Sequence, residues 1–192
     1  MKKVCVLKAS PRKAGNTYSL LAVMLDELKK QNCQVVELDL YDMNINSCVA
    51  CRECQKDWTK VYCVQNDDFG KVVEAVMDSD LILLASPIYS WYCTPPMKAT
   101  LDRLVYAMNM YYGDEWGPSL WKGKSIAIVT TCGYPPEKGA DLFEEGMKRY
   151  AKHSKLNYLG MLCERQKNYK EKFVDDEKEK RAIEFAKSIL EV

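Results

Sequence analysis

The chain of 192 residues is long enough for one domain with a hydrophobic core and short for two. Hydrophobic residues make up 47% of it and charged residues 29%, which is typical of a globular protein rather than a disordered one. Its formal net charge of +1 gives no strong field that would attract nucleic acid or an anionic membrane surface.

No apolar run reaches the length needed to span a bilayer, and the longest, around residues 81–85, has the length of a strand. The apolar stretch behind the N-terminal lysine pair is too short for a signal peptide. Nine cysteines fit the cytosol if they are reduced thiols or metal ligands, and an odd number excludes a complete set of disulfides within one chain. We therefore expect a cytoplasmic protein.

The first part of the chain alternates between strand and helix patterns. Apolar and β-branched residues predict a strand over 3–9, and apolar residues at helical spacing predict a helix that includes residues 20–28. Asn16 or Thr17 would cap the start of that helix. A second strand is predicted over 34–40.

A long polar loop over 41–66 follows the second strand and contains four closely spaced cysteines. Asp67 or Asp68 would cap the next helix, whose apolar face is predicted over 69–77. Residues 80–86 are apolar almost without alternation, which predicts a strand with both faces buried. Such a strand belongs in the centre of a parallel sheet.

The second half continues the alternation. The spacing predicts helices over 97–108 and 142–150, strands over 125–131 and 156–163, and a closing helix within 175–191. Five strands that alternate with helices predict an α/β fold, a doubly wound parallel sheet with helices on both faces.

No internal repeat, low-complexity tract or linker interrupts this pattern, so we interpret residues 1–192 as a single domain with a cysteine-rich loop at 41–66. Ligands of such sheets bind beyond the carboxyl ends of the strands. The loops expected there are 10–17, 87–95 and 131–138.

The loop "SPRKAGNT" over 10–17 joins the first strand to the first helix and has the composition of an anion site. The free N–H groups and the dipole of the helix would point at one spot, and Arg12 would add a cation. Gly15 would allow a close backbone approach, and Ser10, Asn16 and Thr17 would add donors. A phosphate is the expected ligand of this loop. The alternative interpretation is a solvated turn with a good helix cap.

The spacing in this loop excludes three better-known phosphate sites. A Walker A loop has Gly-Lys-Ser/Thr, whereas Lys13 here precedes Gly15. The dinucleotide fingerprint G-x-G-x-x-G needs more than the one glycine present. A phosphatase loop with Cys5 as nucleophile and Arg12 as phosphate ligand is excluded, because Cys5 lies inside the first strand and six residues separate it from Arg12.

The loop resembles the S-P-R-x-x-(G/S)-N-T segment of the NAD(P)H-dependent FMN reductases and iron–sulfur flavoproteins, within the flavodoxin-like superfamily. Residues 85–104, "ASPIYSWYCTPPMKATLDRL", are similar to the family's second conserved segment, and "TTCGY" over 130–134 stands where its third flavin loop begins. The resemblance implies a flavodoxin-like sheet of strand order 2-1-3-4-5 and a bound FMN.

The resemblance also assigns residues of all three loops to this cofactor. The residues implied to hold the FMN phosphate are Ser10, Arg12, Asn16 and Thr17, together with Gly15 in the same loop. Those implied to lie along the flavin ring system are Pro87, Ile88, Tyr89, Ser90 and Trp91, and those at its other edge are Thr131, Cys132 and Gly133. For the aromatic residues of 89–92, ordinary packing or a patch at a subunit interface is the alternative reading.

Four cysteines, Cys48, Cys51, Cys54 and Cys63, have the spacing C-x2-C-x2-C-x8-C. Thiolates that converge in this way bind iron–sulfur clusters or zinc. The iron–sulfur flavoproteins have a similar C-x2-C-x2-C-x4–7-C motif between the second strand and second helix, and the last gap here is one residue longer. The resemblance implies a [4Fe–4S] cluster, with zinc or free redox-active thiols as alternatives. Cys5, Cys33 and Cys163 are interpreted as small buried hydrophobic residues.

We therefore expect an FMN-dependent oxidoreductase that passes electrons from NAD(P)H to a small acceptor such as a quinone, a nitroaromatic compound or a flavin. One alternative is an iron–sulfur flavoprotein that takes electrons from ferredoxin through a [4Fe–4S] cluster. Another is a flavin-binding sensor or scaffold whose cysteines bind zinc. The resemblance further implies a homodimer or homotetramer.

We expect no catalytic acid or base among the side chains, because the cofactor supplies the chemistry. His153, the single histidine, is predicted on a charged helix and interpreted as a surface residue. Asp102 and Arg103 are interpreted as members of ion pairs or of a subunit contact.

Overall fold

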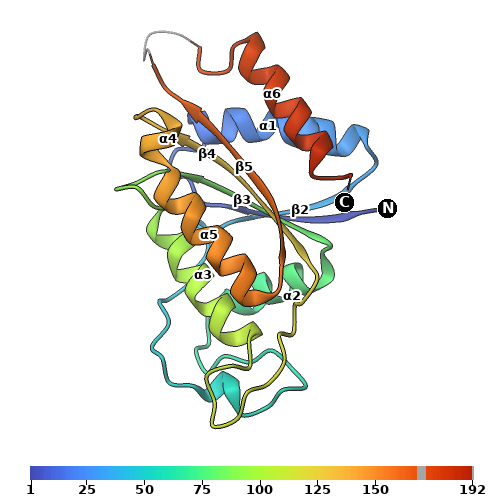
Figure 1. The fold of residues 1–192 in the computed structure, drawn as a ribbon, viewed down its shortest axis with the longest axis vertical. Helices are drawn as coiled ribbons and strands as arrows, with labels where there is room; N and C mark the ends of the chain where they lie inside the picture. Colours follow the sequence, from blue (N-terminus) through green and yellow to red (C-terminus); the bar gives the residue numbers. More distant parts are fainter. Residues whose placement is uncertain (168–171, 192) are drawn as a thin grey trace.

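The computed structural model describes residues 1–167 and 172–191 (Figure 1). Five parallel strands form one sheet in the order β2-β1-β3-β4-β5. The strands are β1 Lys3–Lys8, β2 Gln34–Asp39, β3 Leu81–Pro87, β4 Ser125–Cys132 and β5 Asn157–Arg165. The predicted fold class and strand order are confirmed, and the predicted strands agree with the structure to within two residues at each end.

Helices cover both faces of this sheet (Figure 1). They are α1 Asn16–Lys30, α2 Phe69–Asp78, α3 Pro95–Met108, α4 Pro136–Gly139, α5 Asp141–Ser154 and α6 Asp176–Ser188. α1 and α6 pack together on one face, whereas α2, α3 and α5 pack on the other. No helix in the described part of the chain is long and apolar enough to cross a membrane.

The central strands are apolar on both sides because each side packs against a helical layer. Along β3, Leu81 and Leu83 face α1 and α6, whereas Ile82 and Leu84 face α2, α3 and α5. All four are essentially buried. The same alternation runs through β1 and β4, so the absence of a polar face in these strands follows from their central position.

Three local features differ from the sequence-based expectations. The N-cap of α1 is Gly15, so the prediction of Asn16 or Thr17 is wrong, and both residues belong to the first turn. Short α4 was not predicted, because four residues that begin at a proline carry no helical periodicity. The predicted loop 41–66 contains a short 3₁₀ helix, η1 Glu53–Gln55. For α2 the N-cap is Asp68, one of the two predicted residues.

The strand order places a crevice beyond the carboxyl ends of β1 and β3. The chain moves from β1 to β2 on one side and then returns to β3 on the other side of β1, so the two following loops diverge there. Open α/β sheets bind their ligands at such a switch point.

Candidate functional site

A cavity of about 450 Å³ lies at this switch point, within the range of ordinary cofactor sites. The loops after β1, β3 and β4 all contribute to it, and the residue after β5 closes one side. Its lining residues are Ser10, Pro11, Arg12, Ala14, Gly15, Asn16, Thr17, Pro87, Ile88, Tyr89, Thr131, Cys132, Gly133 and Gln166. The structure thus brings together all the residues assigned to the cofactor except Ser90 and Trp91.

The N-terminus of α1 opens into this cavity without a cap. Gly15 provides no side chain at the N-cap, and no acidic residue lies in the first turn. The first N–H groups of a helix have no acceptor within the helix, and its dipole places positive charge there. With Arg12 beside it in the cavity wall, this end of the helix suits an anion such as phosphate.

The loop before α1 is folded tightly around Gly15. The Gly15 N–H donates to the Arg12 carbonyl oxygen at 2.9 Å, and the Arg12 N–H donates to Ser10 Oγ at 3.3 Å. A Cβ added at Gly15 would lie 2.8 Å from Arg12 Cβ and 3.0 Å from the Arg12 carbonyl oxygen. Glycine is therefore required for this loop to keep its curvature, since any side chain would push Arg12 away.

Two side-chain hydrogen bonds tie α1 to the opposite wall of the cavity. Thr17 Oγ1 lies 2.7 Å from Thr131 Oγ1, and both side chains are buried. Asn16 Nδ2 donates to Gln166 Oε1 at 2.6 Å. Sequence reasoning missed Gln166, although its place directly beyond the carboxyl end of β5 is the signal that could have indicated it.

The second loop turns sharply just outside the cavity. Ser90 and Trp91 have φ values of 48° and 64°, and the flanking Tyr89 and Tyr92 exchange backbone hydrogen bonds of 2.8 and 3.0 Å. Positive φ at both central residues is costly for non-glycine residues. The turn directs Trp91 outward, where its Nε1 donates to the Lys138 carbonyl oxygen at 3.0 Å.

Trp91 also stacks against Tyr134 with a centroid distance of 6.2 Å. Both rings are largely exposed, at 48% for Trp91 and 63% for Tyr134. Together with half-exposed Tyr89 they form an aromatic rim beside the cavity. Their position fits the alternative reading of this loop as an aromatic patch.

A network that the sequence did not reveal supports the outer side of the loop over 10–17, called the phosphate-type loop below. Lys13 Nζ lies 2.6 Å from Asp39 Oδ2 at the end of β2, and Tyr18 Oη donates to the same oxygen at 2.8 Å. Burial by itself raises the pKa of Asp39, but the hydrogen bonds from Lys13 and Tyr18 outweigh it and hold that pKa below its usual value. Lys13 is thus engaged away from the cavity, and Arg12 is the cation of this loop that lines it.

The four clustered cysteines surround a separate, much smaller cavity. Cys48, Cys51, Cys54 and Cys63 all line it, and its free volume of about 20 Å³ is room for roughly one water molecule. Within the described residues, no three His, Cys, Asp or Glu side chains are placed to share a metal ion. The donor set fits a soft metal or an iron–sulfur cluster by its chemistry, whereas the sulfur positions do not form a ligand set.

Arg103 of α3 holds this cysteine loop in place. Its guanidinium donates to Asp67 Oδ2 at 2.5 Å, to the Asn46 carbonyl oxygen at 3.2 Å and to Cys63 Sγ at 3.1 Å. It also lies 4.1 Å from the centroid of the Phe69 ring. The Arg103 and Asp67 side chains are almost completely buried, and Arg103 Nε has no acceptor among the described residues.

The remaining charged candidates have structural partners. Asp102 pairs with Lys98 one turn earlier on α3, at 2.6 Å, so the ion-pair interpretation holds for Asp102 and for Arg103. His153 Nε2 lies 2.7 Å from Tyr112 Oη at the surface. Cys5 is buried as expected, and burial raises the pKa of its thiol to about 12. Cys33 and Cys163 are only half-buried, so their interpretation as buried residues is wrong.

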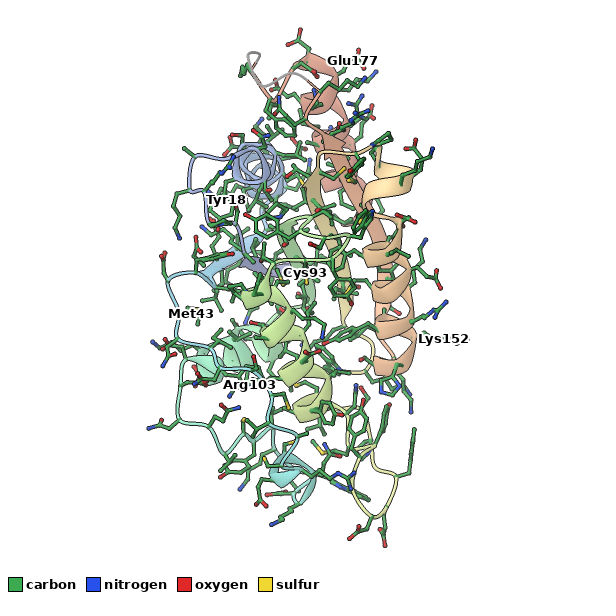
Figure 2. The ribbon with its side chains drawn as sticks, turned by 90° about the vertical axis from the view of Figure 1, so that its left-hand side faces the viewer. Tyr18, Met43, Cys93, Arg103, Lys152 and Glu177 are labelled. Atoms are coloured by element: carbon green, nitrogen blue, oxygen red, sulfur yellow. The ribbon has the colours of Figure 1, made fainter. Side chains whose placement is uncertain are left out.

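The cavity at the switch point, called the larger cavity below, and the small cavity of the cysteine loop lie in different parts of the molecule. Tyr18, at the start of α1, and Arg103, at the cysteine loop, are well separated along the long axis of the molecule in Figure 2. In Figure 1 the cysteine loop, in cyan, lies at the end of the molecule away from α1 and α6. The cysteine cavity is therefore not part of the wall of the larger cavity.

The chain is similar to several known flavoproteins and oxidoreductases in sequence. An iron–sulfur flavoprotein of Archaeoglobus fulgidus is 36% identical over 140 residues, which cover 71% of this chain and 58% of that protein. The human ribosyldihydronicotinamide dehydrogenase [quinone] is 26% identical over 185 residues, covering 83% of this chain and 77% of that protein. The chain spans about half the length of three iron–sulfur flavoproteins that it matches.

Among solved structures, the azoreductase AzrA superposes with a TM-score of 0.72 over 99% of this chain and 100% of that one. At 17% sequence identity, this likeness shows a shared fold. Residues 2–140, which contain the loops after β1, β3 and β4, match the family described as NADPH-dependent FMN reductase. The chain therefore belongs to the NADPH-dependent FMN reductase family.

Proposed function

We propose that this protein is an FMN-dependent oxidoreductase that passes electrons from NAD(P)H to a small acceptor such as a quinone, a nitroaromatic compound or a flavin. The observation that carries the proposal is the uncapped N-terminus of α1, which opens beside Arg12 into a cavity of about 450 Å³ at the switch point of the sheet. The names of its relatives, which include a quinone-dependent dehydrogenase, support the same class of reaction.

The lining of the cavity is divided in a way that suits FMN. Arg12, Asn16 and the first-turn N–H groups of α1 would bind the phosphate at one end. Pro87 and Ile88 would give an apolar wall for the flavin ring system, and the backbone around Gly133 would meet its polar edge. Bound FMN supplies hydride and single-electron transfer, which amino-acid side chains cannot perform.

The chain itself would position the cofactor and keep an open face for the second substrate. The described lining residues include no His, Asp, Glu or Lys, so the cavity offers no ordinary acid–base pair. The aromatic rim of Tyr89, Trp91 and Tyr134 would flank a flat donor or acceptor as it enters. The cavity would thus admit the donor and the acceptor in turn.

The test is anaerobic oxidation of NADPH and NADH by the FMN-loaded protein, with a quinone, a nitroaromatic compound and free FMN offered separately. We expect oxidation of the nicotinamide that depends on both the protein and the acceptor. No oxidation with any acceptor, in protein shown to contain FMN, would refute the reductase proposal. We also propose that the protein lies in the cytoplasm. Both nicotinamides are soluble and need no membrane.

A second function, an iron–sulfur flavoprotein that receives electrons from ferredoxin, is favoured by the cysteine loop. Four cysteines line one cavity, and buried Arg103 donates to Cys63 Sγ at 3.1 Å. Cys48, Cys51, Cys54 and Cys63 would be the residues that hold such a cluster, and the cluster would supply single-electron transfer. Their loop lies away from the cavity at the switch point.

Counting iron and acid-labile sulfide after anaerobic purification tests this second function. About four of each per chain would indicate a [4Fe–4S] cluster, and zinc in their place would favour a structural metal. Cys51→Ser should abolish metal binding, whereas Cys33→Ser, which changes a half-exposed cysteine outside the loop, should not. Metal content that is unaffected by Cys51→Ser would contradict the assignment.

We also propose that the protein is a homodimer or homotetramer. The aromatic rim supports this, since large rings such as Trp91 and Tyr134 are often covered at subunit interfaces. Light scattering measures the assembly, and a monomer at micromolar concentration would exclude it.

A further inference from the structure

Two cysteines from neighbouring strands meet beside the larger cavity. Cys132 Sγ, at the end of β4, lies 3.4 Å from Cys163 Sγ in β5. In the register of these strands Cys163 lies opposite Thr130, two residues before Cys132, so both cysteines project from the same face of the sheet. A disulfide needs a separation of about 2.05 Å, so the sulfurs are roughly 1.4 Å from bonding distance.

The two sulfurs are not equivalent. Either sulfur can donate in the Cys132–Cys163 contact, and Cys132 Sγ also donates to the Tyr134 carbonyl oxygen at 3.0 Å. With Cys163 as the donor, this contact lowers the pKa of Cys132, and Arg165 lowers it further. The same hydrogen bond and burial raise the pKa of Cys163. Cys132 is thus the better nucleophile of the pair, and Cys163 is the thiol that stays protonated.

The two cysteines differ in their access to the cavity at the switch point. Cys132 lines this cavity and Cys163 does not, although Cys163 is the less buried of the two residues overall. A small molecule in the cavity would therefore meet Cys132 first. This order, an attacking thiol at the cavity and a resolving thiol next to it, is the arrangement of reactive dithiols.

We propose that Cys132 and Cys163 form a redox-active dithiol that exchanges with small organic disulfides entering the cavity. This reaction is separate from the flavin chemistry proposed above and needs no flavin. It adds a second redox group to the same cavity.

The exchange takes place in two balanced steps. The Cys132 thiolate attacks one sulfur of the small disulfide, forms a mixed disulfide and expels one small thiolate. Cys163 then gives its proton to that thiolate and attacks the Cys132 sulfur, which expels the second small thiolate. The protein pair loses two electrons and becomes a disulfide, and the small disulfide gains them and becomes one thiol and one thiolate. That thiolate takes from the solvent the equivalent of the proton that Cys132 released on ionisation.

The test treats the purified protein anaerobically with one equivalent of bis(2-hydroxyethyl) disulfide, blocks free thiols with N-ethylmaleimide and maps tryptic peptides without reduction. Trypsin should release Ser125–Lys138 and Leu156–Arg165, which contain Cys132 and Cys163 respectively and no other cysteine. We expect these two peptides to be cross-linked, at least ten times more often than any other cysteine pair. The matched control Cys33→Ser should give the same cross-link.

Two variants resolve the order of the steps. Cys163→Ser should stop at a mixed disulfide, so that the peptide with Cys132 carries one hydroxyethylthio group. Cys132→Ser should leave Cys163 unreacted, so that its peptide carries only maleimide and no hydroxyethylthio group. The proposal is overturned if both wild-type peptides are recovered only as maleimide adducts, or if Cys132 does not form the adduct in Cys163→Ser. The flavin content of the same samples is measured by absorbance, so that a failure of flavin binding is seen separately from a failure of the exchange.

Discussion

The hydroxyls of Thr17 and Thr131 lie 2.7 Å apart and join two segments that are 114 residues apart in sequence. Thr17 belongs to the first turn of α1, and Thr131 to the end of β4. Both side chains are buried, and each hydroxyl is the other's hydrogen-bond partner in this contact. The contact therefore fixes the N-terminal end of α1 against the opposite wall of the cavity.

Removal of either hydroxyl should destabilise the fold, because the remaining hydroxyl loses its hydrogen-bond partner. Thr17→Val and Thr131→Val should each lower the free energy of unfolding by about 1–3 kcal/mol, since each leaves a buried hydroxyl without a partner. The double variant should cost less than the sum of the two, because no hydroxyl is then stranded. Urea unfolding of the four proteins measures this, and additivity within about 0.5 kcal/mol would show that the hydroxyls do not interact.

The phosphate-type loop can be tested with two cations from the same loop. Arg12→Ala combined with Asn16→Ala should weaken FMN binding roughly 10- to 100-fold, if the charged contact contributes about 1.5–3 kcal/mol. Lys13→Ala removes the same charge three residues before α1 but affects an ion pair with Asp39 outside the cavity. It should change the FMN dissociation constant far less. Equal effects of the two changes in a fluorescence titration would refute the assigned role of Arg12.

A methyl group at Gly15 should disturb the same loop by a steric route. Gly15→Ala places a Cβ 2.8 Å from Arg12 Cβ, so the loop must shift and FMN binding should weaken at least tenfold. Gly70→Ala is the matched control, since its added Cβ meets nothing within 4 Å and lies in α2. That change should leave FMN binding unaltered and raise stability by about 0.5–1 kcal/mol. Unchanged FMN affinity in Gly15→Ala would contradict the close packing of this loop.

The Arg103–Asp67 pair should make stability depend on pH. Burial by itself raises the pKa of Asp67, but hydrogen bonds from Arg103 and from the backbone outweigh it and hold the pKa below its usual value. The stabilisation is therefore fully present above the unfolded-state pKa, near 3.9, and is lost as the pH falls through the lower native pKa.

Asp67→Asn should accordingly cost about 3–5 kcal/mol at pH 6, where it leaves buried Arg103 without a counter-charge. The difference from the wild type should shrink as the pH falls from 5 towards 3. Asp102→Asn removes a carboxylate from an exposed pair with Lys98 and should cost no more than about 1 kcal/mol. Denaturant unfolding over this pH range measures these free energies of unfolding. A difference between the wild type and Asp67→Asn that stays constant or increases as the pH falls would contradict the assigned pair.

The fold could be predicted because its signals are local. The unbroken apolar run of β3 reports burial on both faces, and the polar loop at 10–17 reports the switch point of the sheet. The site was harder to predict from the sequence where it depends on backbone turns or on residues far apart in the chain. Nothing in the local sequence says that Ser90 and Trp91 adopt positive φ and leave the cavity, or that Gln166 bonds to Asn16 across 150 residues.

The same limit applies to the cysteines. Their spacing drew attention to Cys48, Cys51, Cys54 and Cys63, whereas the close pair of Cys132 and Cys163 depends on the register of β4 against β5. Register between parallel strands is set by packing over the whole sheet, so no spacing rule could have predicted this pair.

The FMN content of the protein tests the central claim most directly. Flavin is released from the purified chain after reconstitution with FMN and removal of the excess, and it is counted against protein concentration. The account predicts one FMN per chain, bound in the cavity that contains Arg12 and the start of α1. Protein that folds normally and yet retains no flavin would contradict it.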